Sequence, residues 1–248
     1  MPAFHSKSRP RRLLSLLILA VGLLGLNGPG LAREELQQVG EWMAHYYEHP
    51  DPGKLPAWVK DAAAAGAFDK PSARFPLMIF ISRLIQDNPE RGLPWCRELS
   101  ALPSAHKAYL GWAFRNAGSP VQEECIGKIL GLDEADRQKV LGARLHDPLA
   151  RNPEHPGDLD MLWATFMATG AELPVERIIT VLGLPDPAQG APDGVRILLL
   201  KGAARWSLSA NIRQHRRVAE IAEARRTQAS GQLRQALDEI LAETRNPP

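Results

Sequence analysis

The sequence predicts an all-α protein of about eleven short helices, packed as antiparallel helix pairs in an irregular α-solenoid-like array. After residue 33, apolar residues recur at spacings of three and four along most of the chain, which is the period of an amphipathic helix. The chain of 248 residues has 21 Pro and 20 Gly, and many of them stand where one periodic segment gives way to the next. The apolar runs at 78–81 and 195–200 do not alternate with polar residues, so neither indicates a strand.

Start and stop signals delimit the expected helices in the first half of the chain. Val39 and Met43 lie on one face of a first helix, which ends before Pro50 because proline cannot continue a helix. Asn88 followed by Pro89 predicts an N-cap and a proline at the first helical position. Further helices are expected through Trp58 and at 73–87, 104–118, 119–130 and 133–145, with Ser104, a capping box at 119–122 and Asp133 at the starts of the last three.

Two proline-rich loops divide the second half of the chain. The segments HDPLARNPEHPG at 146–157 and PDPAQGAPDG at 185–194 have no helical periodicity. Between them, we expect Asp158 to cap a helix that stops at Gly170, and Pro174 to open a helix through Leu182. The last quarter predicts helices at 195–207, near 211–226 and near 232–244.

A weak internal repeat indicates how these helices pair. WAFRNAGSPVQEECIGKIL from Trp112 and WATFMATGAELPVERIITVL from Trp163 both run from a tryptophan helix through glycine into a second apolar helix, and ARWSLSANIRQHRRVAEIA around Trp206 is a looser copy. The tryptophans are 51 and 43 residues apart, which is close to the period of paired-helix repeats that share one core. An irregular bundle is the alternative. The three tryptophans are expected to anchor the core rather than to bind a ligand.

The N-terminus predicts a secretory signal peptide. Residues 1–12 contain four basic residues and no acidic one, residues 13–26 are uninterruptedly apolar, and residues 27–30 break any helix. Gly30 and Ala32 provide the small residues of a cleavage site before Arg33. We therefore expect a signal peptide at 1–32, a single helical domain at 33–248, and a periplasmic or secreted location. The alternative is an uncleaved leader, which would be the chain's only contact with a membrane.

The charge is unevenly distributed along the chain. Removal of the leader changes the formal net charge from +2 to −2, while residues 196–248 carry a net charge of +5. Arg213, Arg216 and Arg217 share faces at the start of an expected helix and form a candidate site for an anion or an acidic glycan. The alternative is an ordinary solvated helix face. Nucleic acid is not an expected partner for an exported protein.

Both cysteines lie in the mature chain. Cys96 and Cys125 are 29 positions apart, each within a helical pattern. Exported proteins meet oxidants, so the sequence predicts a disulfide between them. The alternative is a pair of buried thiols that behave as small apolar side chains.

The sharpest chemical motif is His45-Tyr46-Tyr47-Glu48-His49. It matches the H-x-x-E-H pattern of inverted zinc proteases, in which two histidines share a helix face and the glutamate is the base. The motif makes His45, Glu48 and His49 candidate metal ligands. The prolines that follow end the helix at His49, and the alternative is therefore an ordinary surface helix end.

A second group of candidate metal ligands lies in and just after the first loop. His146 and His155 are its histidines, and Asp147, Glu154, Asp158 and Asp160 are close to them in sequence. Their spacing matches no known metal loop, and proline-rich connectors often collect such residues. The chain lacks a G-x-S-x-G elbow, a phosphate-binding G-x-x-x-x-G-K-[ST] and a dinucleotide fingerprint, so we expect no organic cofactor and assign no catalytic residue.

Three stretches resemble a group of uncharacterised bacterial exported proteins of helical type. They are YYEHPDPGKLPAWV (46–59), LDMLWATFMATGAELPVERIITVL (159–182) and ARWSLSANIRQH (204–215). The resemblance covers most of the mature chain and implies export and a helical fold. It supplies no activity and no catalytic residue.

These observations favour a non-catalytic interaction or scaffold protein of the cell envelope that binds a protein partner through stacked helix pairs. One alternative is an envelope metal-dependent hydrolase that uses the histidines and carboxylates at 45–49 and 146–160. Another is an anion or glycan binder that uses the basic C-terminal helices. A metal enzyme would bring several of these histidines and carboxylates within ligand distance of one another, whereas a scaffold would leave them scattered on helix ends and loops.

Overall fold

The computed structural model describes residues 30–245, and this part of the chain is helical and contains no strand. It has twelve α-helices, α2–α13, joined by short turns and loops. The predicted all-α fold is therefore confirmed. The predicted signal peptide lies outside the described residues, apart from its last three residues, which belong to the first turn of α2. None of the helices between residues 30 and 245 combines the length and the hydropathy of a membrane span.

The elements follow one another in the order that the helical periodicity predicts. The first part of the chain contains α2 (Gly30–His45), η1 (Tyr46–Glu48), η2 (Pro52–Lys54), α3 (Leu55–Ala64), η3 (Ala67–Asp69), α4 (Pro71–Asp87), η4 (Pro89–Arg91), α5 (Gly92–Leu99), α6 (Ser104–Asn116), α7 (Gln122–Glu124), the π-helical turn η5 (Cys125–Ile129) and α8 (Glu134–Gly142). The second part contains α9 (Pro156–Thr169), α10 (Glu172–Leu182), α11 (Gly194–Gln214), α12 (Arg216–Gln228) and α13 (Gly231–Arg245).

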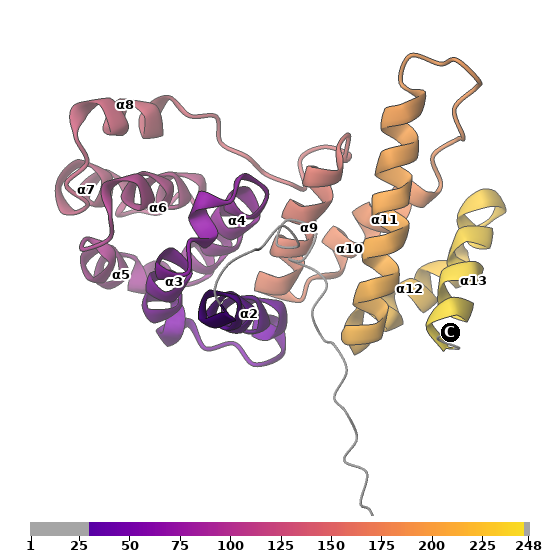
Figure 1. Ribbon diagram of the computed structural model, residues 1–248, viewed down its shortest axis with the longest axis horizontal. Coiled ribbons are helices and arrows are strands. Elements are labelled where there is room, and N and C mark those ends of the chain that lie inside the picture. Colours follow the sequence, from indigo (N-terminus) through magenta and orange to yellow (C-terminus); the bar gives the residue numbers. More distant parts are fainter. Residues whose placement is uncertain (1–29, 246–248) are drawn as a thin grey trace, which may run out of the picture.

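The helices form an elongated array. Figure 1 shows α3–α8 at one end, α9 and α10 in the middle, and α11–α13 at the other end. Helix α9 joins the two ends, because it packs against α4 on one side and against α10 and α11 on the other. A single hydrophobic core extends from Val39 in α2 to Leu241 in α13. The repetition of paired helices stays a prediction.

Helix α9 is the centre of this core, and its sequence explains why. Its apolar residues occur all round the helix rather than along one stripe, which is typical of a helix buried on every side. Nearly every residue of its second half is buried, and the buried residues are Leu159, Met161, Leu162, Trp163, Ala164, Thr165, Phe166, Met167 and Ala168.

Some of the predicted caps are confirmed and others are wrong. Asp133 accepts a hydrogen bond of 2.8 Å from the backbone N–H of Asp136 and caps α8. The capping box predicted at 119–122 does not form, because Ser119 belongs to the turn before α7 and its hydroxyl bonds to no group in the described part of the chain. Asp158 lies in the first turn of α9, where its carboxylate accepts the backbone N–H of the actual N-cap, His155, at 3.0 Å. The helix begins earlier than predicted because Pro156 fits its first position.

Two predictions in the last quarter are corrected. Helix α11 does not end near residue 207 but continues to Gln214, because the segment 208–210 contains no helix breaker. Trp112 and Trp163 are buried in the core as predicted, but the prediction for Trp206 is wrong: it is 41 % exposed. The helical period places Trp206 on a stripe of apolar residues, and this stripe lies on the outer side of α11.

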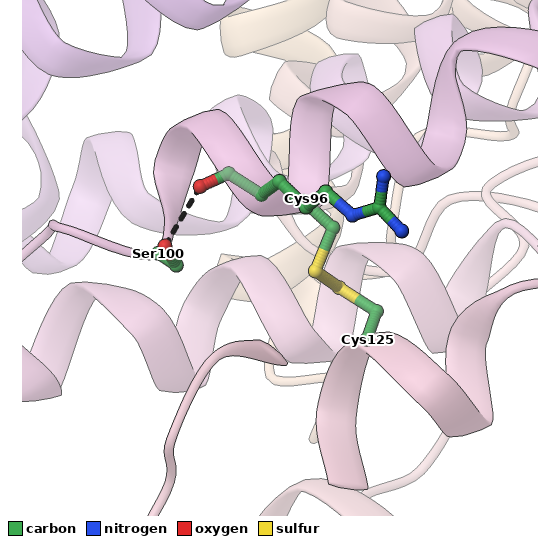
Figure 2. Close-up of a disulfide and its surroundings, with 4 residues drawn as sticks. Cys96, Ser100 and Cys125 are labelled. Atoms are coloured by element: carbon green, nitrogen blue, oxygen red, sulfur yellow. Dashed lines mark hydrogen bonds between the residues drawn. A yellow bond between two sulfur atoms is a disulfide. The ribbon is translucent and has the colours of Figure 1, made fainter. Parts of the chain in front are cut away.

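The predicted disulfide between Cys96 and Cys125 is present (Figure 2). Cys96 lies in α5 and Cys125 begins η5, and the two Cα atoms are 5.9 Å apart. Both cysteines are fully buried. The bond therefore fixes α5 to η5, the turn that follows α7.

Candidate metal centre

Four polar side chains meet where α2 and α11 end, although they come from opposite parts of the sequence. They are His45 at the end of α2, Tyr47 and Glu48 in η1, and His215 directly after α11. Nδ1 of His45 lies 3.1 Å from Oε2 of Glu48. The other carboxylate oxygen, Oε1, accepts the Tyr47 hydroxyl at 3.0 Å and lies 3.5 Å from Nδ1 of His215.

The 3-10 turn η1 determines which residues of the H-x-x-E-H motif come together. The α-helix stops at His45, and residues 46–48 continue as a tighter turn. Side chains three positions apart are eclipsed in such a turn, so His45 and Glu48 lie on the same side. His49 follows the turn with φ −140°, is exposed and does not belong to the group. The helix pairing of His45 with His49 that the motif predicts is therefore replaced by a pairing of His45 with Glu48.

His215 enters the group from the other end of the molecule. Its backbone is extended, with φ −125° and ψ 108°, between the end of α11 and the start of α12. Its ring is fully buried, and its centroid lies 5.0 Å from that of His45 and 5.8 Å from that of Tyr47. Its Nε2 atom has no hydrogen-bond partner among residues 30–245.

Helix α9 forms the wall behind these side chains. The ring of Phe166 packs against Tyr47 with centroids 4.7 Å apart and against His215 at 6.3 Å. Gly170 ends α9 in a left-handed conformation, with φ 64°. A Cβ atom at this position would lie only 2.9 Å from Cδ2 of Tyr47, so the glycine lets the Tyr47 ring approach the helix end.

We expect Gly170→Ala to destabilise the protein more than the matched change Gly118→Ala. Both glycines have left-handed backbones, with φ 64° and φ 62°, and an alanine in that conformation costs about 1–2 kcal/mol. Only at Gly170 would the new methyl group also press on the Tyr47 ring, because a Cβ at Gly118 has nothing described within 4 Å. Such overpacking adds about 1–3 kcal/mol. Urea denaturation of both variants measures the difference, and equal losses of stability would contradict the close approach of Tyr47.

The surroundings set the protonation of the group. Burial raises the pKa of Glu48, but hydrogen bonds from Tyr47, His45 and His215 outweigh it, so that the net pKa is lowered. The pKa of Tyr47 is raised by burial and by its bond to Glu48. The pKa of His215 is lowered, chiefly by burial and then by the neighbouring His45. At neutral pH, Glu48 is therefore ionised, Tyr47 is protonated and His215 is neutral.

The remaining candidate residues lie elsewhere. His155 is exposed at the start of α9, and the backbone of His146 pairs with the side chain of Asn116. Within residues 30–245, His45, Glu48 and His215 are the one set of three metal-ligating side chains whose ligand atoms all lie within 4.8 Å of one another.

The three candidate anion-binding arginines point to different partners. Arg213 bonds to Ser209, Arg216 to Glu220, and Arg217 to Glu172. The last two are therefore neutralised by carboxylates of the same chain. The anion site stays a prediction, with less support than the metal-ligating group.

No family model, curated protein or solved structure matches the chain. The resemblance to exported helical proteins therefore stays a prediction. Its three stretches nevertheless meet at one place, because Tyr47 belongs to the first, Phe166 and Gly170 to the second, and His215 to the third.

His215 is not among the ligands predicted from the sequence, although its spacing contains a signal. Ala204, Leu208, Asn211 and His215 recur at spacings of three and four, and all four are fully buried. Two polar residues that continue an inward-facing apolar stripe indicate a buried polar site. The arginines on either side of His215 indicate an exposed basic face at the same place, which obscures this signal.

Proposed function

We propose that this protein binds a divalent transition-metal ion of the zinc type between His45, Glu48 and His215. The observation that carries the proposal is that each of these side chains offers one ligand atom within 4.8 Å of the other two. Two imidazoles and a carboxylate are a ligand set that zinc accepts.

The separations between the donor atoms support this assignment. Around a tetrahedral zinc ion with bonds of about 2.0–2.1 Å, neighbouring donor atoms lie about 3.3 Å apart. The distance from His45 Nδ1 to Glu48 Oε2 is 3.1 Å, and that from Glu48 Oε1 to His215 Nδ1 is 3.5 Å. The two distances run to different oxygens of the Glu48 carboxylate, so an ion between the two histidines would bind both oxygens or would require the carboxylate to rotate.

The neighbouring groups suit a metal site as well. A carboxylate binds a metal ion in its ionised form, and an imidazole binds it in its neutral form. These are the states described above for Glu48 and His215. Glu41 lies 3.9 Å from Nε2 of His45 and can orient that ring, as carboxylates commonly do for metal-bound histidines. The Tyr47 hydroxyl holds Glu48 in place.

Three protein ligands leave a coordination position for water or a substrate, as in catalytic zinc sites. If the bound ion is catalytic, the protein is a metal-dependent hydrolase of the cell envelope, which is one of the alternatives given by the sequence. The Tyr47 hydroxyl, which donates to Glu48 and lies 3.3 Å from His215 Nδ1, would then be a proton donor beside the ligands.

Metal binding by the purified wild type and by the variants Glu48→Gln, His45→Gln and His49→Gln tests the proposal. After treatment with a chelator, the wild type is titrated with Zn²⁺ alone by calorimetry and with Co²⁺ alone by its visible absorption. We expect one ion per chain. Glu48→Gln and His45→Gln should weaken binding by more than about 100-fold, because losing a group that merely orients a ligand already costs about 10–100-fold.

His49→Gln is the matched control for these variants. His49 belongs to the same motif but is exposed and outside the group, so its loss should leave the affinity unchanged. Far-UV circular dichroism verifies that every variant is folded. A loss in His49→Gln equal to that in His45→Gln, or a wild type that binds no ion, would overturn the proposed site.

A further inference from the structure

The outer face of α11 is apolar, in addition to its inner face. Val195, Leu198, Leu199 and Trp206 are 72 %, 57 %, 62 % and 41 % exposed. With Gly202 they recur at spacings of three and four, so they form one stripe along the helix, which we call the outer stripe. The inner face is buried in the core through Leu200, Ala204 and Leu208.

The outer stripe is unusual for a surface helix. Single exposed apolar residues are common, but a continuous row of large ones marks an interaction site. A helix that is apolar on opposite faces is normally covered on both. In Figure 1, the first turns of α11 rise beyond the ends of α10 and α13, which leaves this part of the helix accessible to another molecule.

The cations beside the outer stripe are neutralised within the chain. Arg196 pairs with Asp193 at 3.6 Å, and Lys201 pairs with Asp186. Arg205 pairs with Glu239 at 2.8 Å and also with Glu243. Two copies of α11 can therefore approach each other without repulsion between unpaired like charges.

The order of large and small residues fits an antiparallel copy of the same helix. In an antiparallel pair, the numbers of facing residues have a constant sum. If Leu199 of one copy faces Gly202 of the other, the sum is 401. Trp206 then faces Val195, and Leu198 faces Ala203. Each contact thus places a larger side chain opposite a smaller one. A Cβ atom at Gly202 would meet nothing described within 4 Å, which leaves room for the partner's leucine.

We propose that the outer stripe binds a second copy of this chain, with the two α11 helices antiparallel and the two-fold axis level with residues 200–201. Such a contact is isologous and closes after two subunits. Residues 195–206 span only about 17 Å of helix, so one such stripe buries less area than the roughly 800 Å² per partner of a standard stable interface. The dimer is therefore reversible and depends on protein concentration. The inference goes beyond metal binding and does not depend on it.

Sedimentation velocity over a range of protein concentrations, with a chelator present, tests this proposal. The wild type should pass from monomer to dimer as the concentration rises through the micromolar range. Leu199→Glu places two carboxylates near the two-fold axis and should weaken the dimer by at least about 100-fold, since two like charges at a desolvated contact repel each other strongly. Because Leu199 is exposed in the monomer, the variant should keep the wild-type melting curve at low concentration.

Leu141→Glu at the end of α8 is the matched control. Leu141 is 44 % exposed and lies outside the proposed interface, so this variant should dimerise like the wild type. A second variant, Leu199→Cys with Gly202→Cys, should form a covalent dimer under mild oxidation. A wild type that stays monomeric at every concentration, or a Leu199→Glu variant that dimerises normally, would overturn the proposal.

Discussion

Phe166→Ala is expected to lower the free energy of unfolding by about 3–5 kcal/mol, the usual cost of removing a buried phenylalanine ring. Phe166 is fully buried in the last turn of α9, the helix that joins the two ends of the array. Its ring contacts Tyr47, Trp163 and His215, with centroid distances of 4.7, 6.0 and 6.3 Å. The cavity would therefore open directly behind the candidate metal centre.

Phe75→Ala provides the comparison, because the same atoms are removed from a ring that is 53 % exposed. Surface changes of this kind alter stability by about 0.5 kcal/mol or less. Urea denaturation of both variants, followed by tryptophan fluorescence and circular dichroism, measures the two losses. If they were similar, the placement of α9 at the centre of the core would be wrong.

Loss of the Cys96–Cys125 bond is expected to cost about 3–4 kcal/mol, the chain-entropy value for a loop of about 30 residues. The double variant Cys96→Ala, Cys125→Ala removes the bond, and reduction of the wild type removes it without a change of sequence. Because both sulfur atoms are buried, reduction should require partial unfolding and should be slow under native conditions.

Denaturation with and without a reducing agent separates the bond from other effects of the substitution. The reducing agent should destabilise the wild type and leave the double variant unchanged. Two free thiols in protein purified from oxidising conditions would contradict the bond, as would a wild type whose stability is insensitive to complete reduction.

The fold class follows from local signals. Helical periodicity and frequent prolines predict helices rather than a sheet, and residues 30–245 contain helices, turns and loops but no strand. Asp133 caps α8 and Gly170 ends α9, as the sequence predicts. A cap and a left-handed helix end depend mainly on the residue itself and its nearest neighbours. The cap predicted at Ser119 fails, since the chain turns there before α7 begins.

The candidate metal centre is only half visible in the sequence. The pairing of His45 with Glu48 is local, although the 3-10 turn that produces it differs from the helix that the motif predicts. His215 joins them from 167 positions beyond Glu48 because α9 packs between the two ends of the chain. Local spacing indicates that His215 is buried, but which side chains it meets depends on tertiary packing.

What the sequence by itself determined is therefore the helical class, most helix boundaries and the cysteine pair, all of which depend on short-range preferences or on the chemistry of two residues. Only the tertiary structure decided which apolar stripe of α11 faces the core. Both faces of that helix are apolar, so its periodicity cannot distinguish the buried Leu208 from the exposed Trp206. The contact with α9, α10, α12 and α13 covers one face and leaves the other for a partner.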